Sequence, residues 1–210
     1  EKTKALSDRY MFFSRIKSAE GKVPLIIYLH GGGGHRRDVS TLVNSPIARK
    51  VTQKKYPFVV LIPQYKPATD VPNGWQPDDL KHLIEHAVDA HGVDPERVFV
   101  TGSSMGGAGT WMLANKYPDV IAAAAPMSAG GATAPKSDLP VSASTLKNVA
   151  IWAFHGDADK TCPHEMIETL VQEIEAAGGN PKFTLIPGGN HGATHKVYTE
   201  GELYEWFLKQ

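Results

Sequence analysis

The chain has a single cysteine, no excess of charge of either sign and no long apolar run. Cys162 alone excludes an internal disulfide, and we interpret it as a small packed apolar side chain. The 22 basic and 22 acidic residues balance, so nothing indicates a nucleic-acid or anionic-membrane partner. No apolar stretch approaches the roughly 20 residues of a membrane-spanning helix. The sequence starts at Glu1 without a signal peptide, so we expect a processed protein or a piece of a longer one, with localisation open and an extracytoplasmic location favoured.

Length and a repeated strand-then-helix rhythm indicate the fold class. A chain of 210 residues is long enough for one well-buried domain and too short for two ordinary domains, so we expect one domain over residues 1–210. Helical periodicity follows Asp78 and Asp79, spans 167–174 and returns near Trp206. The alternation predicts an α/β fold, with a mostly parallel central sheet covered by helices on both faces. Apolar runs predict strands at 9–16, 24–30, 57–63, 97–102, 120–126, 149–155 and 181–187.

The most informative segment is 98–107, Val-Phe-Val-Thr-Gly-Ser-Ser-Met-Gly-Gly. It contains Gly-x-Ser-x-Gly between a predicted strand and a helix-compatible stretch, the context in which the motif holds a serine in a strained turn at the sheet edge. Ser104 is therefore the candidate nucleophile. The alternative is a glycine-rich turn in which Ser104 only caps the following helix. Features elsewhere in the chain favour the first interpretation.

A run of four glycines follows the predicted strand at 24–30. Residues 31–34 form a poor structural element but allow bare backbone N–H groups to face a ligand. In hydrolases with a nucleophile elbow, one such N–H and that of the residue after the nucleophile form the oxyanion hole. The candidates here are the N–H groups of Gly32 or Gly33 and of Met105.

A carboxylate and a histidine follow two later strands. Asp157 and Asp159 come just after the strand at 149–155, at the edge where α/β sheets build their sites. His191 stands in the Gly-Gly-Asn-His-Gly loop after the strand at 181–187. His195 competes with it but lies nearer the final helix, so we favour His191. The chain order of nucleophile, acid and histidine is the order found in the α/β-hydrolase fold.

The sequence resembles the α/β-hydrolase superfamily from about residue 10 to 208, most specifically over 93–111. Within it the chain is similar to compact single-domain esterases of the carboxylesterase/phospholipase, feruloyl-esterase and polyhydroxybutyrate-depolymerase type. The resemblance implies that His-Gly-x-x-Asp at 155–159 supplies the acid, Asp159, and that Pro-Gly-x-x-His at 187–191 supplies His191. Ser103 and the Ala-Thr pair at 193–194 depart from relatives, which affects the expected pocket shape.

These residues predict a serine carboxylic-ester hydrolase that needs no cofactor. His191 would take the proton of Ser104 and return it to the leaving group, and Asp159 would orient the imidazole. Only residues 127–148 separate the strand at 120–126 from the strand that precedes the acid, so we expect no lid domain and an open site. That site suits short-acyl or small aromatic esters, free or attached to a polymer. The alternatives are a serine peptidase of the same fold and a non-catalytic binding domain.

The surroundings of the site are less defined by sequence. Trp75 and Gln64 follow the strand at 57–63 and are candidates for the substrate pocket, although Trp75 is equally compatible with packing beneath a turn. The His164-Glu165 segment lacks the second histidine of a zinc helix, and His191 and His195 stand in a glycine loop without a nearby carboxylate motif, so we expect no metal. We expect a monomer.

Overall fold

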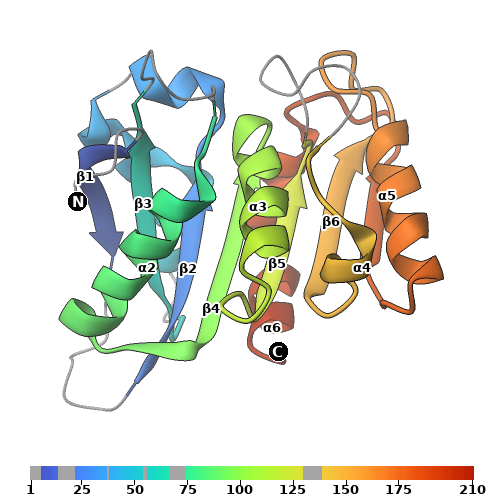
Figure 1. The fold of residues 1–210 in the computed structure, drawn as a ribbon. Coiled ribbons are helices and arrows are strands. Elements are labelled where there is room, and N and C mark those ends of the chain that lie inside the picture. Colours follow the sequence, from blue (N-terminus) through green and yellow to red (C-terminus); the bar gives the residue numbers. More distant parts are fainter. Residues whose placement is uncertain (1–5, 14–21, 37, 54–55, 67–73, 130–138) are drawn as a thin grey trace.

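The computed structural model describes residues 6–13, 22–36, 38–53, 56–66, 74–129 and 139–210 (Figure 1). One seven-stranded sheet runs through them in the order β1-β3-β2-β4-β5-β6-β7. β1 pairs antiparallel with β3, and every other neighbouring pair is parallel. The strands are β1 (Leu6–Phe13), β2 (Val23–Leu29), β3 (Val59–Tyr65), β4 (Val93–Ser103), β5 (Ala123–Met127), β6 (Ala150–Gly156) and β7 (Lys182–Ile186).

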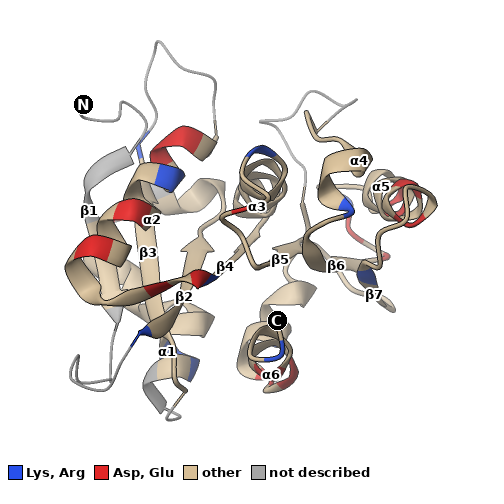
Figure 2. Cartoon of the chain, turned by 60° about the horizontal axis from the view of Figure 1, so that its bottom comes forward, with Lys and Arg blue, Asp and Glu red and all other residues tan. Residues whose placement is uncertain are grey.

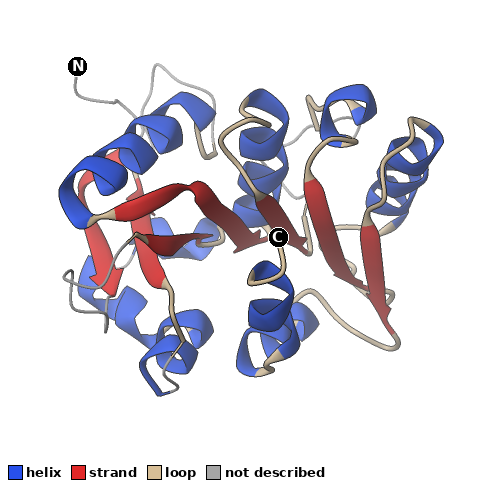
Figure 3. Ribbon diagram, turned by 90° about the horizontal axis from the view of Figure 1, so that it is seen from below, coloured by secondary structure: helices blue, strands red, loops and turns tan. Residues whose placement is uncertain are grey.

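Helices cover both faces of this sheet, as seen from below in Figure 3. Four pack on one face: α2 (Pro77–His91), α3 (Met105–Lys116), α4 (Ala143–Leu146) and α5 (Glu165–Ala176). The other face carries α1 (Pro46–Gln53) and α6 (Glu202–Phe207), with the short 3₁₀ helices η2 (Val39–Asn44) and η3 (Ala193–Thr199). A further 3₁₀ turn, η1 (Gly32–Arg36), directly follows the end of β2.

Burial on both faces explains why the central strands read as continuous apolar runs. In β2, Leu25, Ile27 and Leu29 enter the core beneath α2 and α3. Ile26 and Tyr28 enter the second core, beneath α1 and α6. A parallel strand covered by helices on both sides needs apolar side chains at every position, not at alternate ones. The sheet therefore fixes the carboxyl ends of β2, β4 and β6 at one common edge.

The predicted α/β architecture with a mostly parallel sheet is confirmed, and the strand boundaries differ by a few residues. The first strand ends at Phe13, and residues 14–16 of the expected strand lie outside the described part. α1 was not predicted. Its apolar residues are few, and it gains its place by burying Ile47 and Val51 against the sheet. Of the segment expected to be too short for a lid, 130–138 lie outside the described residues.

Acidic positions are concentrated on the outer helices α2, α5 and α6 (Figure 2). The two acidic residues Asp78 and Asp79 occupy the first turn of α2, where they complement the helix dipole. That helix ends at His91 and is capped by Gly92, whose left-handed φ of 65° suits a glycine. No helix in the described part of the chain is long and apolar enough to span a membrane.

Candidate active site

Ser104 occupies a sharp bend between β4 and α3. Its backbone has a φ of 58° and a ψ of −119°, in a region that L-residues with a side chain rarely adopt. Such a conformation costs about 1–3 kcal/mol and persists only where the surroundings enforce it. Here the Ser104 N–H donates to Met127 O at 3.0 Å, and its carbonyl accepts the Ala108 N–H at 3.0 Å. The bend lifts the serine side chain to the carboxyl edge of the sheet.

The glycines of the motif let this bend pack against β2. A Cβ at Gly106 would lie 1.9 Å from Leu29 O, and one at Gly102 would lie 2.6 Å from the same oxygen. Both distances are far inside van der Waals contact with backbone atoms that cannot move aside. These two positions therefore require glycine for close approach of backbone to backbone.

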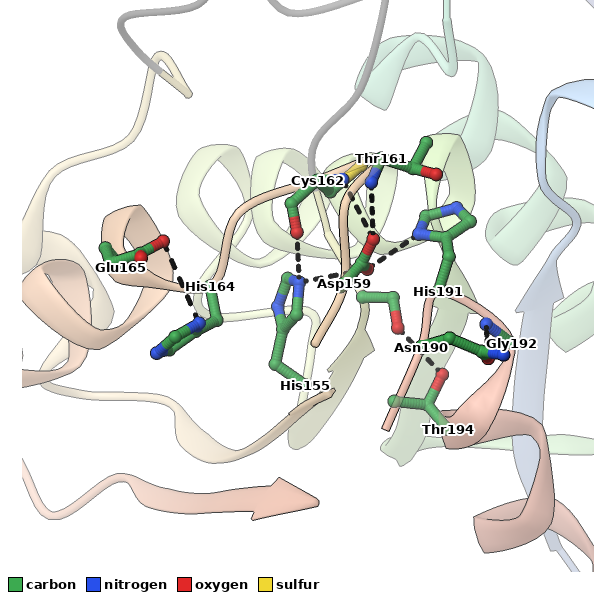
Figure 4. A network of polar contacts seen from close by, with 11 residues as sticks. His155, Asp159, Thr161, Cys162, His164, Glu165, Asn190, His191, Gly192 and Thr194 are labelled. Atoms are coloured by element: carbon green, nitrogen blue, oxygen red, sulfur yellow. Dashed lines mark hydrogen bonds and ion pairs between the residues drawn. The ribbon is translucent and has the colours of Figure 1, made fainter. Parts of the chain in front are cut away.

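Asp159 and His191 meet at the same edge, from the turn after β6 and the loop after β7. His191 Nδ1 lies 2.7 Å from Asp159 Oδ2 (Figure 4). The other carboxylate oxygen accepts the N–H groups of Thr161 at 2.9 Å and Cys162 at 3.0 Å. The Asp159 side chain is fully buried. Burial alone would raise the pKa of Asp159, but the Cys162 N–H, His191 and the Thr161 N–H outweigh it and lower the pKa. The carboxylate is therefore ionised at neutral pH.

The buried carboxylate determines which nitrogen of His191 carries the proton. An ionised carboxylate only accepts hydrogen bonds, so Nδ1 must donate and neutral His191 keeps the lone pair on Nε2. His191 and Ser104 both line one pocket of about 420 Å³. This arrangement can remove the proton of a serine hydroxyl and hold it for a leaving group.

Gly31 to Gly34 line the same pocket and form the wall facing Ser104. A Cβ at Gly31 would lie 3.5 Å from the Cβ of Ser104, which shows how closely this backbone approaches the serine. Gly32 and Gly33 have open space around their Cα atoms. Met105 is the first residue of α3, and the first N–H groups of a helix have no acceptor within the helix. Gly32 and Gly33 line the pocket, and Met105 adjoins Ser104 in the chain but is not among the described residues that line the pocket, so the oxyanion role of these N–H groups stays a prediction.

Comparison with known proteins gives the family. The sequence profile of the phospholipase/carboxylesterase family matches residues 76–199, more than half of the chain. The chain belongs to this family. It is thus a carboxylesterase-type hydrolase, and the expected resemblance to α/β-hydrolase esterases is confirmed.

Individual relatives agree with this assignment. A protein of Salmonella typhimurium assigned as a carboxymethylenebutenolidase is 25% identical over 236 aligned residues, covering 96% of this chain and 83% of its own. Poly(3-hydroxyalkanoate) depolymerase C of Paucimonas lemoignei is 34% identical over 82 residues, 39% of this chain and 18% of the depolymerase. The crystal structure of a thermostable esterase has a TM-score of 0.78 at 26% identity, covering 96% of this chain and 58% of its own.

A buried histidine braces the glycine loop of the hydrolase, and sequence reasoning gave it no role. His30 Nδ1 lies 2.8 Å from Gly31 O, and its Nε2 accepts the N–H of Tyr65 at 3.1 Å. The imidazole is therefore neutral, with its proton on Nδ1. A Cβ at Gly34 would lie 2.1 Å from His30 Nδ1, so the loop wraps directly around this ring. The only indication of this role in the sequence is the position of His30, at the end of a predicted strand and directly before the four glycines.

Trp75 and Gln64, the two predicted pocket residues, lie away from the described lining of the Ser104 pocket. Trp75 is fully buried, packs against Gly109 and donates its indole N–H to His30 O at 3.1 Å. It lies beneath the glycine loop as packing. The pocket opens instead toward η2 and η3, on the other face of the sheet.

His155 is a second buried histidine that the sequence did not reveal as part of the site. Its Nε2 lies 2.9 Å from Cys162 O and 3.3 Å from Asp159 Oδ2, while Nδ1 has no hydrogen-bond partner among the described residues (Figure 4). Burial lowers the pKa of His155 and keeps it neutral. It supports the loop that presents Asp159. Burial, followed by the nearby Asp159, raises the pKa of Cys162 to about 11, in keeping with a packed side chain.

The two competing candidates, Asp157 and His195, do not form the carboxylate–histidine contact. Asp157 is exposed, whereas Asp159 is buried against His191. His195 lines the pocket, and His191 holds the carboxylate contact. Within the described residues, no group of three or more His, Cys, Asp or Glu side chains is arranged to hold a metal ion.

Proposed function

We propose that the chain is a serine carboxylic-ester hydrolase that cleaves short-acyl or small aromatic esters through an acyl-enzyme on Ser104. The observation that carries this proposal is the convergence of three sequence-distant groups at one pocket. Ser104 in its strained bend and His191 with Nδ1 committed to buried Asp159 line the same 420 Å³ space. Pockets of about 300–1,000 Å³ are typical of small-molecule sites.

In the proposed first half-reaction, His191 Nε2 takes the hydroxyl proton as Ser104 Oγ attacks the ester carbonyl. The carbonyl oxygen becomes an oxyanion, which the N–H groups of Met105 and of Gly32 or Gly33 stabilise. Donors of this kind are each worth about 3 kcal/mol of barrier. The C–O bond to the alcohol then breaks, and the alcohol leaves with the proton held by His191.

In the second half-reaction, a water molecule gives its proton to His191 Nε2 and attacks the acyl carbon. The bond to Ser104 Oγ breaks, the serine recovers the proton, and the carboxylic acid leaves. Asp159 stays ionised throughout and stabilises the imidazolium that forms in each half. A lactone is a cyclic ester, so the same steps would open the kind of ring that the name of the carboxymethylenebutenolidase relative implies.

Chromogenic esters with acyl chains of two to twelve carbons test the proposal. We expect hydrolysis concentrated at short chains and reduced on the order of 10⁶-fold in Ser104→Ala. Ser103→Ala is the matched control, because it removes a hydroxyl from the neighbouring residue of the same pocket, at the end of β4, and leaves the Ser104 hydroxyl in place. Activity that survives Ser104→Ala would contradict the assigned nucleophile. A lack of activity on every ester would favour a peptidase or a binding role.

A further inference from the structure

The pocket has an inner wall formed by residues that take no part in the proposed proton transfers. Tyr28 of β2 and Leu42 of η2 are buried there, at 5% and 6% exposure. Thr41, Asn44 and His195 line the same pocket and are exposed, so they stand at its mouth. The inner wall is therefore built from a tyrosine and a leucine, and its mouth from neutral polar groups.

Tyr28 differs from the two tyrosines buried beside it. The Tyr198 hydroxyl lies 2.9 Å from Thr101 Oγ1, and the Tyr204 hydroxyl donates to Tyr198 O at 2.9 Å. The Tyr28 hydroxyl has no hydrogen-bond partner among the residues that the structure describes. Its ring is held edge-on against Tyr198, with centroids 5.3 Å apart. Of these three phenols, the one that lines the pocket is the one without a partner.

The Tyr28 hydroxyl oxygen is not among the fully buried polar atoms that lack a partner, so it is open to the pocket although its ring is buried. A hydroxyl in such a position is completed by water or by a ligand. Burial raises the pKa of Tyr28 to about 12, so the phenol keeps its proton at neutral pH and remains a donor. A pocket occupant with an oxygen acceptor near this wall would satisfy it. An occupant with only a hydrocarbon chain there would leave it unsatisfied.

The mouth of the pocket presents the same uncharged chemistry. The Thr41 hydroxyl donates to Asp38 O at 2.7 Å and keeps its oxygen lone pairs for a donor. Asn44 offers an amide, which both donates and accepts. Partial burial and the neighbouring His191 lower the pKa of His195, so its imidazole is neutral at neutral pH. These groups match alcohols, which also donate and accept, better than they match an ion.

We propose that Tyr28 donates a hydrogen bond to the substrate and makes the pocket selective for esters whose acyl or alcohol part carries neutral hydroxyl groups. Hydroxyacyl esters and acetylated polyols share this chemistry. The inference rests on the proposed function, because it takes the Ser104 pocket as the place where the ester binds. Tyr28 is a specificity-determining residue in this account and takes no part in the bond-making steps.

Two matched substrate pairs distinguish the acyl side from the alcohol side. The first pair is p-nitrophenyl butyrate and p-nitrophenyl 3-hydroxybutyrate, which differ by one acyl hydroxyl. The second is propyl acetate and 2,3-dihydroxypropyl acetate, which differ only in the alcohol. For each pair we measure the ratio of kcat/KM, hydroxylated ester over parent, in the wild type and in Tyr28→Phe. Phenylalanine keeps the ring contact with Tyr198 and removes only the hydroxyl.

We expect the wild type to prefer the hydroxylated ester in at least one pair, and that ratio to fall about tenfold in Tyr28→Phe. The matched control is Tyr117→Phe, because the Tyr117 hydroxyl donates to Asp78 on the opposite face of the sheet. It should keep the wild-type ratio. Thermal melts of the three proteins show whether each is folded.

The outcomes separate the two proposals. Hydrolysis of the parent esters with a ratio that Tyr28→Phe leaves unchanged in both pairs would overturn the role of Tyr28 and leave the esterase proposal standing. Failure to hydrolyse any of the four esters would overturn the esterase proposal. In that case the role of Tyr28 is still tested by the affinity of two proteins for the intact acetates, the Ser104→Ala variant and the double variant Ser104→Ala with Tyr28→Phe. Equal affinities for propyl acetate and 2,3-dihydroxypropyl acetate would refute it.

Discussion

The change Asp159→Asn isolates the charge of the buried carboxylate at almost constant volume. In the wild type, Oδ1 of Asp159 accepts two backbone N–H groups and Oδ2 accepts His191 Nδ1. An asparagine has one oxygen and one NH₂ group. Because the N–H groups of Thr161 and Cys162 demand the oxygen, the NH₂ group must turn toward His191 Nδ1.

Two donors then face each other, and His191 relieves the conflict by moving its proton to Nε2. The imidazole can no longer accept the proton of Ser104, and no carboxylate stabilises the imidazolium. In the serine-protease triad the equivalent change costs about 10⁴-fold in kcat, and we expect a loss of similar order here. Loss of one charged hydrogen bond is worth about 1.5–3 kcal/mol of stability, so the variant should remain folded.

The assay is kcat on a short chromogenic ester, with thermal unfolding measured on the same samples. Asp157→Asn is the matched control, since Asp157 is an exposed carboxylate two residues away. It should retain wild-type kcat within about twofold, because substitutions on an exposed surface usually change free energies by under 0.5 kcal/mol. A loss below tenfold in Asp159→Asn, or an equal loss in Asp157→Asn, would refute the role given to Asp159.

Three further predictions concern the supports of the site. Gly34→Ala places a methyl group against His30, so we expect kcat/KM to fall at least about tenfold and the free energy of unfolding, measured in urea, to fall by about 1–3 kcal/mol. Wild-type values of both quantities would contradict the proposed support of the glycine loop by His30. Trp75→Phe removes the indole bond to His30 O and should cost about 0.5–1.5 kcal/mol of stability with acyl-chain preference unchanged, whereas an altered preference would put Trp75 back in the pocket. The pKa of Asp159 is lowered in the folded state, so its stabilisation is present above the unfolded value of about 3.9 and is lost as pH falls below it. The stability difference between the wild type and Asp159→Asn should therefore shrink in acid, and a difference that grows would contradict the sign.

Much of the fold was predictable because local sequence patterns indicate its strands and helices. Strands buried on both faces consist of unbroken apolar runs, and the apolar residues of α2 and α5 recur with helical periodicity. Ser104, Asp159 and His191 each follow a strand, and parallel strands bring their carboxyl ends to one edge. Chain order and strand ends therefore predicted Ser104 and His191, whereas the choice of Asp159 over Asp157 came from the resemblance to α/β-hydrolase esterases.

The rest depended on packing that no local pattern encodes. Trp75 stands in a loop, where a tryptophan can be exposed or buried, and only the contact with Gly109 and the bond to His30 decide between them. Tyr28 lies within an apolar run, so the sequence pattern predicts a core residue. Its lack of a partner becomes visible only when Tyr198 and η2 are placed around it. Such residues are identified by what surrounds them in space.

We propose that Ser104 carries the acyl group, and a covalent probe of the serine hydroxyl can locate the nucleophile. An alkyl fluorophosphonate should add one phosphonyl group to the protein, and trypsin should release the adduct on the peptide that spans residues 98–116. Fragmentation must then separate Ser104 from its neighbour Ser103. We expect a single adduct on Ser104 that is absent from Ser104→Ala and present in Ser103→Ala. Labelling elsewhere, or none in a protein that hydrolyses esters, would contradict it.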